Sequence, residues 1–424
     1  MAAARLPAAV PSRVAAALCA ALAGLAPFAA CAADEEDALK LADQTAAAPE
    51  AGSPWRVFAE GALREARERD GSELRDRRLS VDLRYEGALA PDWRAAFADR
   101  LDTIWQDAAF ADTVNTLKEA YATWQPRPDR IADAGRINAR YGVALGYNPT
   151  DYFKAGAVRS VVSIDPASLR ENRLGTVMAR AQALWSEGSI TGIYAPKLAS
   201  EPSSAPFSAD LGATNSRNRW LVSGSRAIGA FNPQWLVFAG EGAPQFGLNA
   251  TALLGRATVV YAEWSGGRAE SLKARSLALP GDAAFRSRLA SGFTYTTPFR
   301  LSLTAEYDYN GAGLDRSGWA ALARAPADYV RYRTYAANVQ EPATRENFFF
   351  YATWQDALFL HLDINAFQRR DRLDRSRLSW VEARYHWPHA DAALQWQAAS
   401  GTAQSDLGAA PDARALQLLL RYYF

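Results

Sequence analysis

The sequence predicts an all-β protein, a transmembrane antiparallel β-barrel of about 18 strands. Three observations predict this fold class. Apolar and polar residues alternate along most of the chain from Trp55 onward, and the connections between the alternating segments are short and long in turn. Beyond the N-terminus, no apolar stretch reaches the 18 or so residues that a membrane-spanning helix requires. Any segments that cross a membrane must therefore be the alternating ones, as β-strands.

Residues 1–32 have the three-part layout of a secretory signal peptide. Arg5 and Arg13 precede an apolar run over 14–30 that is almost entirely Ala, Leu and Val, and a small residue, Ala32, suits cleavage. We expect this segment to be removed on export. The mature chain is then expected to reside in the outer membrane of a Gram-negative bacterium.

An alternative interpretation makes Cys31 the lipidated residue of a lipoprotein, although Phe28 stands where a smaller aliphatic residue is usual. Residues 33–53 are acidic and then rich in Ala and Pro, which predicts a short flexible periplasmic lead-in. Residues 54–424 are expected to form a single outer-membrane barrel.

Composition excludes several function classes. Both cysteines, Cys19 and Cys31, lie in the signal segment, so the mature chain is expected to lack thiol catalysis and thiolate metal sites. Without Arg5 and Arg13, the 47 Lys and Arg residues fall to 45, against 46 Asp and Glu, which gives no electrostatic case for binding nucleic acid. The 13 Trp, 17 Tyr and 18 Phe residues are typical of a barrel whose apolar face meets lipid.

The strands follow from period-two patterns. "LSVDLRYEGAL" (79–89), "RLSLTAEYDYN" (300–310) and "LFLHLDINAFQR" (358–369) each place apolar residues on one face and polar residues on the other. Counting in this way from Trp55 gives about 18 strands. The three weakest segments, 55–64, 93–105 and 235–239, leave a count of 16 open.

The connections between strands fall into two classes. Tight turns are expected at 90–92, 186–188, 231–234, 255–256, 297–299, 355–357 and 388–391. Long loops are expected at about 146–174, 196–217, 267–284 and 311–345. A meander through a membrane sorts its loops in this way, with short turns on the periplasmic side and long loops outside.

The chain ends on the alternating strand "ALQLLLRYYF" (415–424). An apolar strand at a terminus would be an aggregation-prone edge unless it pairs with another strand, so we expect it to close the barrel against the first. Phe424 resembles the C-terminal aromatic through which barrel-assembly machinery recognises its substrates. Aromatic residues flank the tight turns and the terminus, as in an interfacial girdle: Trp185, Phe231, Trp235, Phe299, Trp354, Trp387 and Phe424.

One region resembles a known family. The segments "LKEAYATW", "AGRINARYGVALGYNPTDYFK" and "RLGTVMARAQALWSEGSITGIYAPKL", within about 114–200, are similar to a group of mostly uncharacterised proteobacterial outer-membrane barrels that is distantly similar to alginate-export-type porins. The matching motifs are Gly135-Arg136, Tyr141-Gly142, Asn148-Pro149-Thr150-Asp151-Tyr152 and Pro196, although Tyr141 stands where the group usually has Trp. The resemblance implies uptake of small polar or aromatic-bearing solutes, or export of an anionic polymer.

Inward-facing charges are the candidate functional residues, because polar groups of the lumen set the selectivity of a pore. The candidate pore-lining residues are Arg84, Arg136, Arg140, Arg180, Glu263, Glu306, Asp308, Asp363 and Arg384. Mixed charges on adjacent strands also form structural ladders that satisfy one another, and this bland interpretation competes with a role in selectivity.

The loop 146–174 is expected to fold inward as a constriction. Its candidate residues are Asn148, Pro149, Asp151, Tyr152, Lys154 and Arg159. The hypothesis is that basic residues around this loop face acidic residues half a barrel away, which would create a transverse field. The Asn-Pro turn also fits a simple anchor for the loop.

The predicted function is a passive, porin-like outer-membrane channel for small polar or anionic solutes, or for an exported anionic polymer. Three His residues, none set beside a Ser as a catalytic pair requires, give no case for an enzyme. No phosphate loop or metal-spaced cluster occurs, so no cofactor is expected. The alternative is a non-conducting barrel that acts as an assembly partner or a surface-binding scaffold through its long loops. The expected partners are outer-membrane lipid, the barrel-assembly machinery and small solutes, without nucleic acid.

Overall fold

The computed structural model describes residues 53–107, 109–240 and 242–424. The expected signal peptide and all but the last residue of the expected lead-in lie outside these residues. The described residues contain the strands β1 (Trp55–Glu68), β2 (Glu73–Ala90), β3 (Trp93–Gln106), β4 (Ala109–Arg127), β5 (Arg130–Ile137), β6 (Thr176–Trp185), β7 (Gly188–Ala195), β8 (Arg219–Arg226), β9 (Phe231–Ala239), β10 (Gln245–Leu254), β11 (Thr258–Ala269), β12 (Ala284–Thr296), β13 (Leu301–Asn310), β14 (Glu346–Trp354), β15 (Leu362–Asp371), β16 (Arg377–His386), β17 (Ala390–Ser400) and β18 (Asp412–Tyr423).

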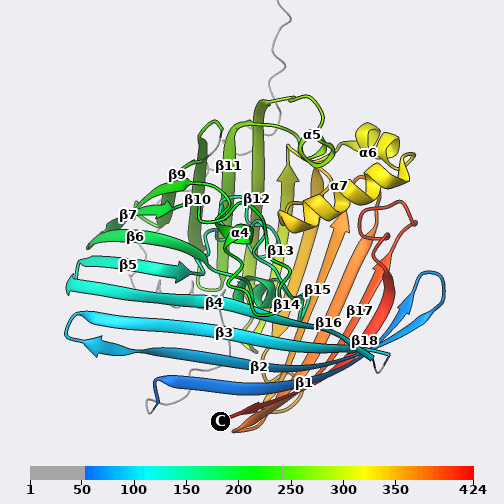
Figure 1. The fold of residues 1–424 in the computed structure, drawn as a ribbon, viewed down its shortest axis with the longest axis horizontal. Helices are drawn as coiled ribbons and strands as arrows, with labels where there is room; N and C mark the ends of the chain where they lie inside the picture. Colours follow the sequence, from blue (N-terminus) through cyan, green and yellow to red (C-terminus); the bar gives the residue numbers. More distant parts are fainter. Residues whose placement is uncertain (1–52, 108, 241) are drawn as a thin grey trace, which may run out of the picture. The chain divides into compact units, whose positions relative to one another are not determined.

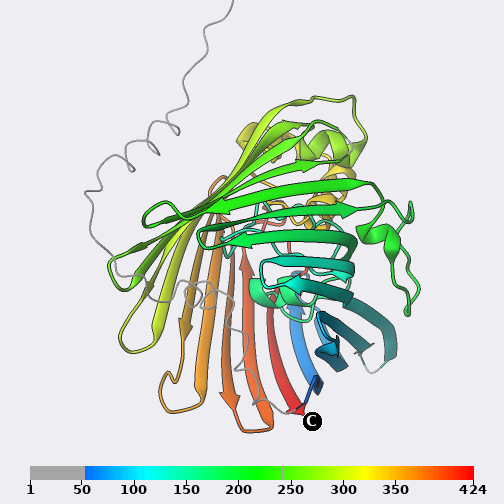
Figure 2. The same ribbon diagram turned by 90° about the vertical axis from the view of Figure 1, so that its left-hand side faces the viewer.

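The strands form one closed antiparallel sheet. Each strand pairs with the next in the chain, and β18 pairs with β1, which gives an 18-stranded barrel in the described residues. The blue β1 lies beside the red β18 near the C-terminus (Figures 1 and 2). The predicted fold class is therefore confirmed, and the three weakest predicted segments form β1, β3 and β9. Pairing of Leu418 with Leu63 shows how the last strand is held: it closes the barrel.

The connections are sorted as predicted. At one end the strands are joined by tight turns of a few residues. The long connections 138–175, 196–218, 270–283, 311–345 and 401–411 all lie at the other end, which also carries the short connections 69–72 and 372–376. These carry the helices α3 (Pro166–Glu171), α4 (Leu211–Thr214), α5 (Leu272–Leu277), α6 (Arg316–Leu322) and α7 (Pro326–Asn338). Helices α5, α6 and α7 gather at the end of the barrel opposite the C-terminus (Figure 1). No helix in the described part of the chain combines the length and apolar character needed to span a bilayer.

The two faces of the sheet are reversed relative to a soluble protein. Leu63, Leu79 and Leu418 are about half exposed on the outer face, whereas Asp82 and Glu263 are fully buried on the inner face. An apolar outer face and a polar inner face are what a bilayer requires of a barrel. The residues predicted for the girdle lie at the tight-turn end or the terminus, and Trp185, Phe299 and Phe424 are exposed there.

The wall is uneven in height. Strands β2 and β4 have 18 and 19 residues, whereas β5, β7 and β8 have 8 each. Strand β5 pairs with β4 only over Ala120–Arg127, which leaves the upper part of β4 without a strand partner on that side. The connection 196–218 covers this part, because Asn115 of β4 donates a backbone hydrogen bond to Pro206 O at 2.9 Å.

One predicted strand begins later than its alternation suggested. Leu358 and Leu360 lie in the turn between β14 and β15, where their side chains are 71% and 70% exposed. His361, in the same turn, is exposed and has a left-handed backbone (φ 71°). Apolar residues in a turn at the lipid surface continue the pattern of the strand that follows. The sequence alone therefore did not show where β15 begins.

Candidate functional site

The site is built around the connection 138–175, here named the constriction loop. It leaves the wall where β5 ends and returns where β6 begins, and between these points it contacts inward-facing residues of β2, β11, β13, β14 and β15. Because these strands lie far apart around the barrel, the loop crosses the interior. The loop is longer than the predicted 146–174, because it begins at residue 138.

Glu263 of β11 is the first anchor. Its carboxylate accepts backbone N–H bonds from Val143 (2.9 Å), Ala144 (3.2 Å) and Thr150 (2.7 Å). The hydroxyl of Thr150 and the amide of Asn148 also donate to it, at 2.8 and 3.3 Å. A carboxylate with this many donors is satisfied without a cation.

Glu306 of β13 is the second anchor. It accepts the backbone N–H groups of Leu145 at 2.9 Å, of Gly146 at 3.0 Å and of Tyr147 at 3.0 Å, and the hydroxyl of Tyr261 at 2.7 Å. Together the two carboxylates bind six backbone N–H groups within eight residues of the loop. A buried N–H group that lacks a partner is costly, so these two side chains fix the path of 143–150.

The residues of the family-like motif serve this anchorage. Gly142 has φ +102°, and a Cβ there would lie 2.6 Å from a carboxylate oxygen of Glu263, so a side chain would be excluded on both counts. At Gly146 a Cβ would lie 2.5 Å from the ring of Phe349, a buried residue of β14. Asn148 donates to Ala144 O at 2.6 Å and so closes the turn.

The next residues of the motif bind the loop to itself and to its neighbouring strands. Asp151 pairs with Arg173 at 2.8 Å, and both side chains are buried. The Tyr152 ring stacks on Phe238 of β9 with 4.5 Å between centroids, and its hydroxyl lies 3.0 Å from Ser265 of β11. The interpretation of "NPTDYF" as a rigid anchor therefore agrees with the geometry.

The outer connection 311–345 is bound to the constriction loop. Lys154 Nζ lies 3.1 Å from Glu341, which follows α7 in the connection 311–345, and Arg288 of β12 lies 3.3 Å from the same carboxylate. Burial alone would raise the pKa of Glu341, but the charges of Lys154 and Arg288 lower it below its usual value. The backbone adds a bond from Gly156 N to Asn338 O at 2.9 Å.

The constriction loop is also held on the side of β2 and β4. Arg84 pairs with Glu171 at the end of α3, and Arg78 donates to Val162 O at 3.1 Å. Arg159 donates to Asn115 O at 2.8 Å and to Ser208 O at 3.1 Å. The loop is thus fixed to opposite sides of the wall as well as to the neighbouring connection 196–218.

The wall of β1–β3 carries a ladder of ion pairs, here named the ion-pair ladder. Glu60 of β1 lies 2.8 Å from Arg78, 2.9 Å from Arg100 and 2.8 Å from Arg421. Asp82 of β2 binds Lys118 of β4 at 2.5 Å and Arg84 at 3.1 Å, while Asp102 binds Arg100 at 3.0 Å. These cross-strand pairs are the structural alternative that the sequence had left open.

The structure separates the predicted pore-lining residues into two groups. Four of them face inward but are buried, at 0, 3, 1 and 3% exposed: Glu263, Glu306, Asp308 and Arg136. They therefore do not line an open lumen as predicted. Arg136 instead donates to Gly175 O at 2.9 Å and to Ala209 O, within the loops. The expected transverse field loses its acidic side, because Glu263 and Glu306 bind backbone N–H groups.

The other predicted residues keep contact with water. The Arg84, Arg180, Arg384 and Asp363 side chains are 16–28% exposed, and each lies beside an ionisable partner. Arg180 pairs with Asp133 at 2.8 Å, Arg384 with Glu382 at 2.9 Å, and Asp363 with His386 at 3.3 Å. Arg140, in the constriction loop, is exposed and makes no ion pair or hydrogen bond with any residue that the structure describes.

Several residues of the site were not predicted. Glu60 and Arg78 fell outside the sequence-based candidates, because the β1 segment had weak alternation and Arg78 precedes the clearest pattern of β2. Lys118 reaches Asp82 from a bulge in β4, where the register shifts and simple parity fails. Phe349, Phe367 and Trp380 form an apolar cluster that supports the loop, against the expectation that the inner face is polar.

Comparison with known proteins supports the fold. Three Pseudomonas aeruginosa outer-membrane porins share it: OccK5 (OpdH), with a TM-score of 0.55 and 10% identity; OccK8 (OprE), with 0.54 and 9%; and OccK2 (OpdF), solved in complex with glucuronate, with 0.54 and 9%. Each match covers 88% of this chain and 98% of the other. No protein-family model and no curated protein matches the sequence. The similarity to alginate-export-type porins stays a prediction, whereas the barrel has the fold of an outer-membrane porin.

Proposed function

We propose that this barrel is a passive outer-membrane channel for small anionic solutes, and that the constriction loop sets its bore. The anchored loop supports this proposal most directly. Glu263 and Glu306 together accept six backbone N–H bonds from it, which holds the loop across the interior at fixed positions. A fixed loop in a closed barrel narrows the passage and places its exposed side chains in the path of a solute.

The preference for anions rests on which charges meet water. Anchorage of the loop buries Glu263 and Glu306, and Asp308 is buried beside them. Arg140 stays exposed on the loop, with no partner among the described residues. The loop covers these acids, whereas the cation of Arg140 remains at its surface. The electrostatic potential in the narrow part of the lumen is therefore positive.

Small carboxylates are the solute class that fits this bias. OccK2, of similar fold, was solved in complex with glucuronate, which makes glucuronate a reasonable first probe. A loop pinned on several sides suits small solutes better than an exported polymer, which would need a wide bore or a movable loop. Export of an anionic polymer therefore ranks second.

The test is single-channel recording of the full mature chain in a planar bilayer under a KCl gradient. We expect discrete openings with a reversal potential on the anion side, and a partial block by added glucuronate. R140E should move the reversal potential toward cation preference. The matched control is R256E, at an exposed Arg in the tight turn between β10 and β11.

Other outcomes would contradict the proposal. A correctly folded barrel without conductance would support the binding scaffold instead. An equal shift in R140E and R256E would show that general surface charge, and not the constriction loop, sets the selectivity.

A further inference from the structure

The lipid-facing surface of the barrel carries a basic cluster at the outer ends of β15, β16, β18, β1 and β2. Six arginines, here named the outer arginine row, are exposed there: Arg67, Arg75, Arg77, Arg370, Arg377 and Arg414. Their inward neighbours Ala66 and Ala415 are 3 and 5% exposed, which shows that the row points away from the lumen. The row lies next to the connections 69–72, 372–376 and 401–411, on the same side as the long loops.

Four of these arginines oppose one another directly. Arg67 pairs in register with Arg414 across β1 and β18, and Arg370 pairs with Arg377 across β15 and β16. Like charges at directly opposite positions destabilise an antiparallel pair. None of the four side chains forms an ion pair or hydrogen bond with a described residue. The sheet therefore holds two repulsive pairs that an external anion would relieve.

Nearby carboxylates neutralise only part of the row. Glu65 lies 3.3 Å from Arg75, and Glu73 stands opposite Arg67 in register without a close ion pair to it. On the row itself, six arginines face two glutamates. This excess lies at the height where strands leave the hydrocarbon layer, and charge is tolerated there at little cost.

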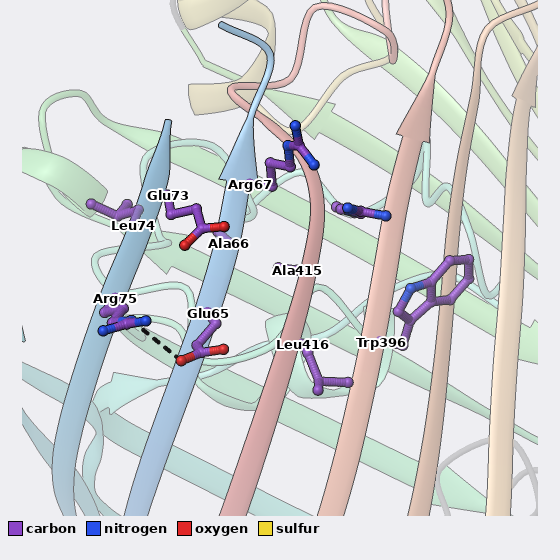
Figure 3. A pocket seen from close by; sticks show the side chains of 10 residues that line it. Glu65, Ala66, Arg67, Glu73, Leu74, Arg75, Trp396, Ala415 and Leu416 are labelled. Atoms are coloured by element: carbon purple, nitrogen blue, oxygen red, sulfur yellow. Dashed lines mark ion pairs between the residues drawn. The ribbon is translucent and has the colours of Figure 1, made fainter. Parts of the chain in front are cut away.

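A shallow hollow of about 200 Å³ lies at the part of the row formed by β17, β18, β1 and β2 (Figure 3). Glu65, Arg67 and Arg75 line one side of it, and Trp396 and Leu416 line the other. The Trp396 and Leu416 side chains are 44 and 47% exposed. Arg414 and Glu73 also line the hollow, so three arginines and two glutamates stand beside an apolar surface suited to a chain of lipid.

On β18, the outward-facing residues change from basic to apolar between one position and the next. On the outer face of β18, Arg414 is followed toward the tight-turn end by Leu416, Leu418 and Leu420, all of them exposed. Two residues of a strand rise about 7 Å, so one lipid could place its head group on the arginines and its acyl chains on the leucines.

The opposite side of the barrel lacks this character. At the outer ends of β10 and β12, the exposed residues Phe246 and Phe285 occupy the lipid-facing row. Arg268 of β11 lies there too, but its guanidinium donates to Ala283 O at 3.1 Å. A general need for arginine at the membrane surface would not favour one side of the barrel.

We propose that the outer arginine row binds the phosphorylated head group of a glycolipid of the outer leaflet, seated in the hollow beside Trp396. Phosphate suits arginine because the guanidinium donates in a fork that matches phosphate oxygens. A phosphate bound between Arg67 and Arg414 relieves their repulsion and joins β18 to β1 at the seam that closes the barrel.

The experiment measures binding of lipid A to the full mature chain in detergent by native mass spectrometry. The probes are bisphosphorylated lipid A, the same lipid without phosphates, and inorganic phosphate alone. The test variant is R67Q/R414Q/R370Q/R377Q. The control is R226Q/R256Q/R300Q, which removes exposed arginines from the tight-turn end. Heat-dependent gel mobility checks that each variant is a folded barrel.

We expect the bisphosphorylated lipid to bind the native chain and the control alike, and the test variant about tenfold or more weakly. Equal binding of dephosphorylated lipid, or equal affinity of the folded test variant, would overturn the proposal. Competition by inorganic phosphate at millimolar concentration, with no gain from the lipid portion, would also overturn it in favour of a simple anion site.

Discussion

Two sides of the inner wall hold their buried carboxylates in different ways. On β11 and β13, Glu263 and Glu306 accept hydrogen bonds mainly from backbone N–H groups of the constriction loop. On β1 and β2, Glu60 and Asp82 are bound by arginine and lysine side chains of the ion-pair ladder. Both arrangements satisfy an acid that would otherwise be costly to bury.

The difference lies in what each arrangement fixes. A backbone donor cannot leave without moving its segment of chain, so Glu263 and Glu306 determine where the loop runs. A side-chain cation can be replaced by a neighbour, and Glu60 has three of them within 2.9 Å. We infer that the first side controls the shape of the passage, and the second the rigidity of the wall.

Removal of a loop anchor should have the largest effect. In E306A, the backbone N–H groups of Leu145, Gly146 and Tyr147 lose their acceptor, at about 1–3 kcal/mol for each group that stays unsatisfied. The loop should leave the wall, and single-channel conductance should rise with larger fluctuations. E306Q keeps one acceptor oxygen and should have an intermediate effect. Unchanged conductance in a folded E306A barrel would show that the loop does not set the bore.

A smaller change at the same anchor should act through packing alone. In G146A, the new Cβ would lie 2.5 Å from the Phe349 ring, which belongs to the buried cluster under the loop. Overpacking of this kind costs about 1–3 kcal/mol. We expect faster hydrogen exchange of 143–150 and a modest change in conductance. G192A is the control, because a Cβ at Gly192 would meet nothing within 4 Å.

The sequence predicted the wall well because its pattern is local. Alternation over a few residues decides which face of a strand a side chain occupies, and the strand count and loop sorting followed from it. Glu263 and Glu306 were correctly placed on the inner face. Their partners, however, lie more than 100 residues earlier in the chain, in a loop whose path no local pattern specifies.

Face and accessibility are therefore separate quantities. Parity assigned Arg136 and Arg140 together to a basic wall, yet one is buried among loop carbonyls and the other is exposed. The pairing of Lys154 with Glu341 joins two long connections and likewise depended on tertiary structure. The motif "NPTDYF" was the useful signal, because its Asn-Pro turn indicated a rigid loop.

The ion-pair ladder should tolerate loss of one member better than the loop anchors do. In R100L, Glu60 keeps Arg78 and Arg421, and Asp102 keeps the Ser80 hydroxyl at 2.6 Å. Loss of a partner from a buried ion pair costs about 3–5 kcal/mol when nothing replaces it, so we expect less than this in the free energy of unfolding. Conductance and reversal potential should stay near those of the native chain. A released loop in R100L would contradict the separation of roles.

Asp406 is a third case, in which a carboxylate has neither kind of partner at close range. It lies in the outer connection 401–411, with Arg333 Nε of α7 3.9 Å from its carboxylate. Burial, together with the nearby charges of Asp371 and Asp374, raises its pKa to about 7. The closed loop therefore favours the protonated acid.

The sign of the pH effect follows from this raised pKa. The closed form is the folded connection 401–411, and the open form is its locally unfolded state, in which Asp406 has its ordinary pKa. Between about pH 4 and 7 the closed form binds more protons than the open form, so its stability falls as the pH rises through this window. Opening should increase by at most about tenfold per pH unit there, as seen in faster hydrogen exchange of 401–411 after correction for the intrinsic rate. D406N removes the titrating proton and should flatten the profile, whereas a pH profile unchanged by D406N would assign it to another group. The conductance should change little, because Glu263 and Glu306, which anchor the constriction loop, lie on β11 and β13, and the groups that donate hydrogen bonds to them all lie outside 401–411.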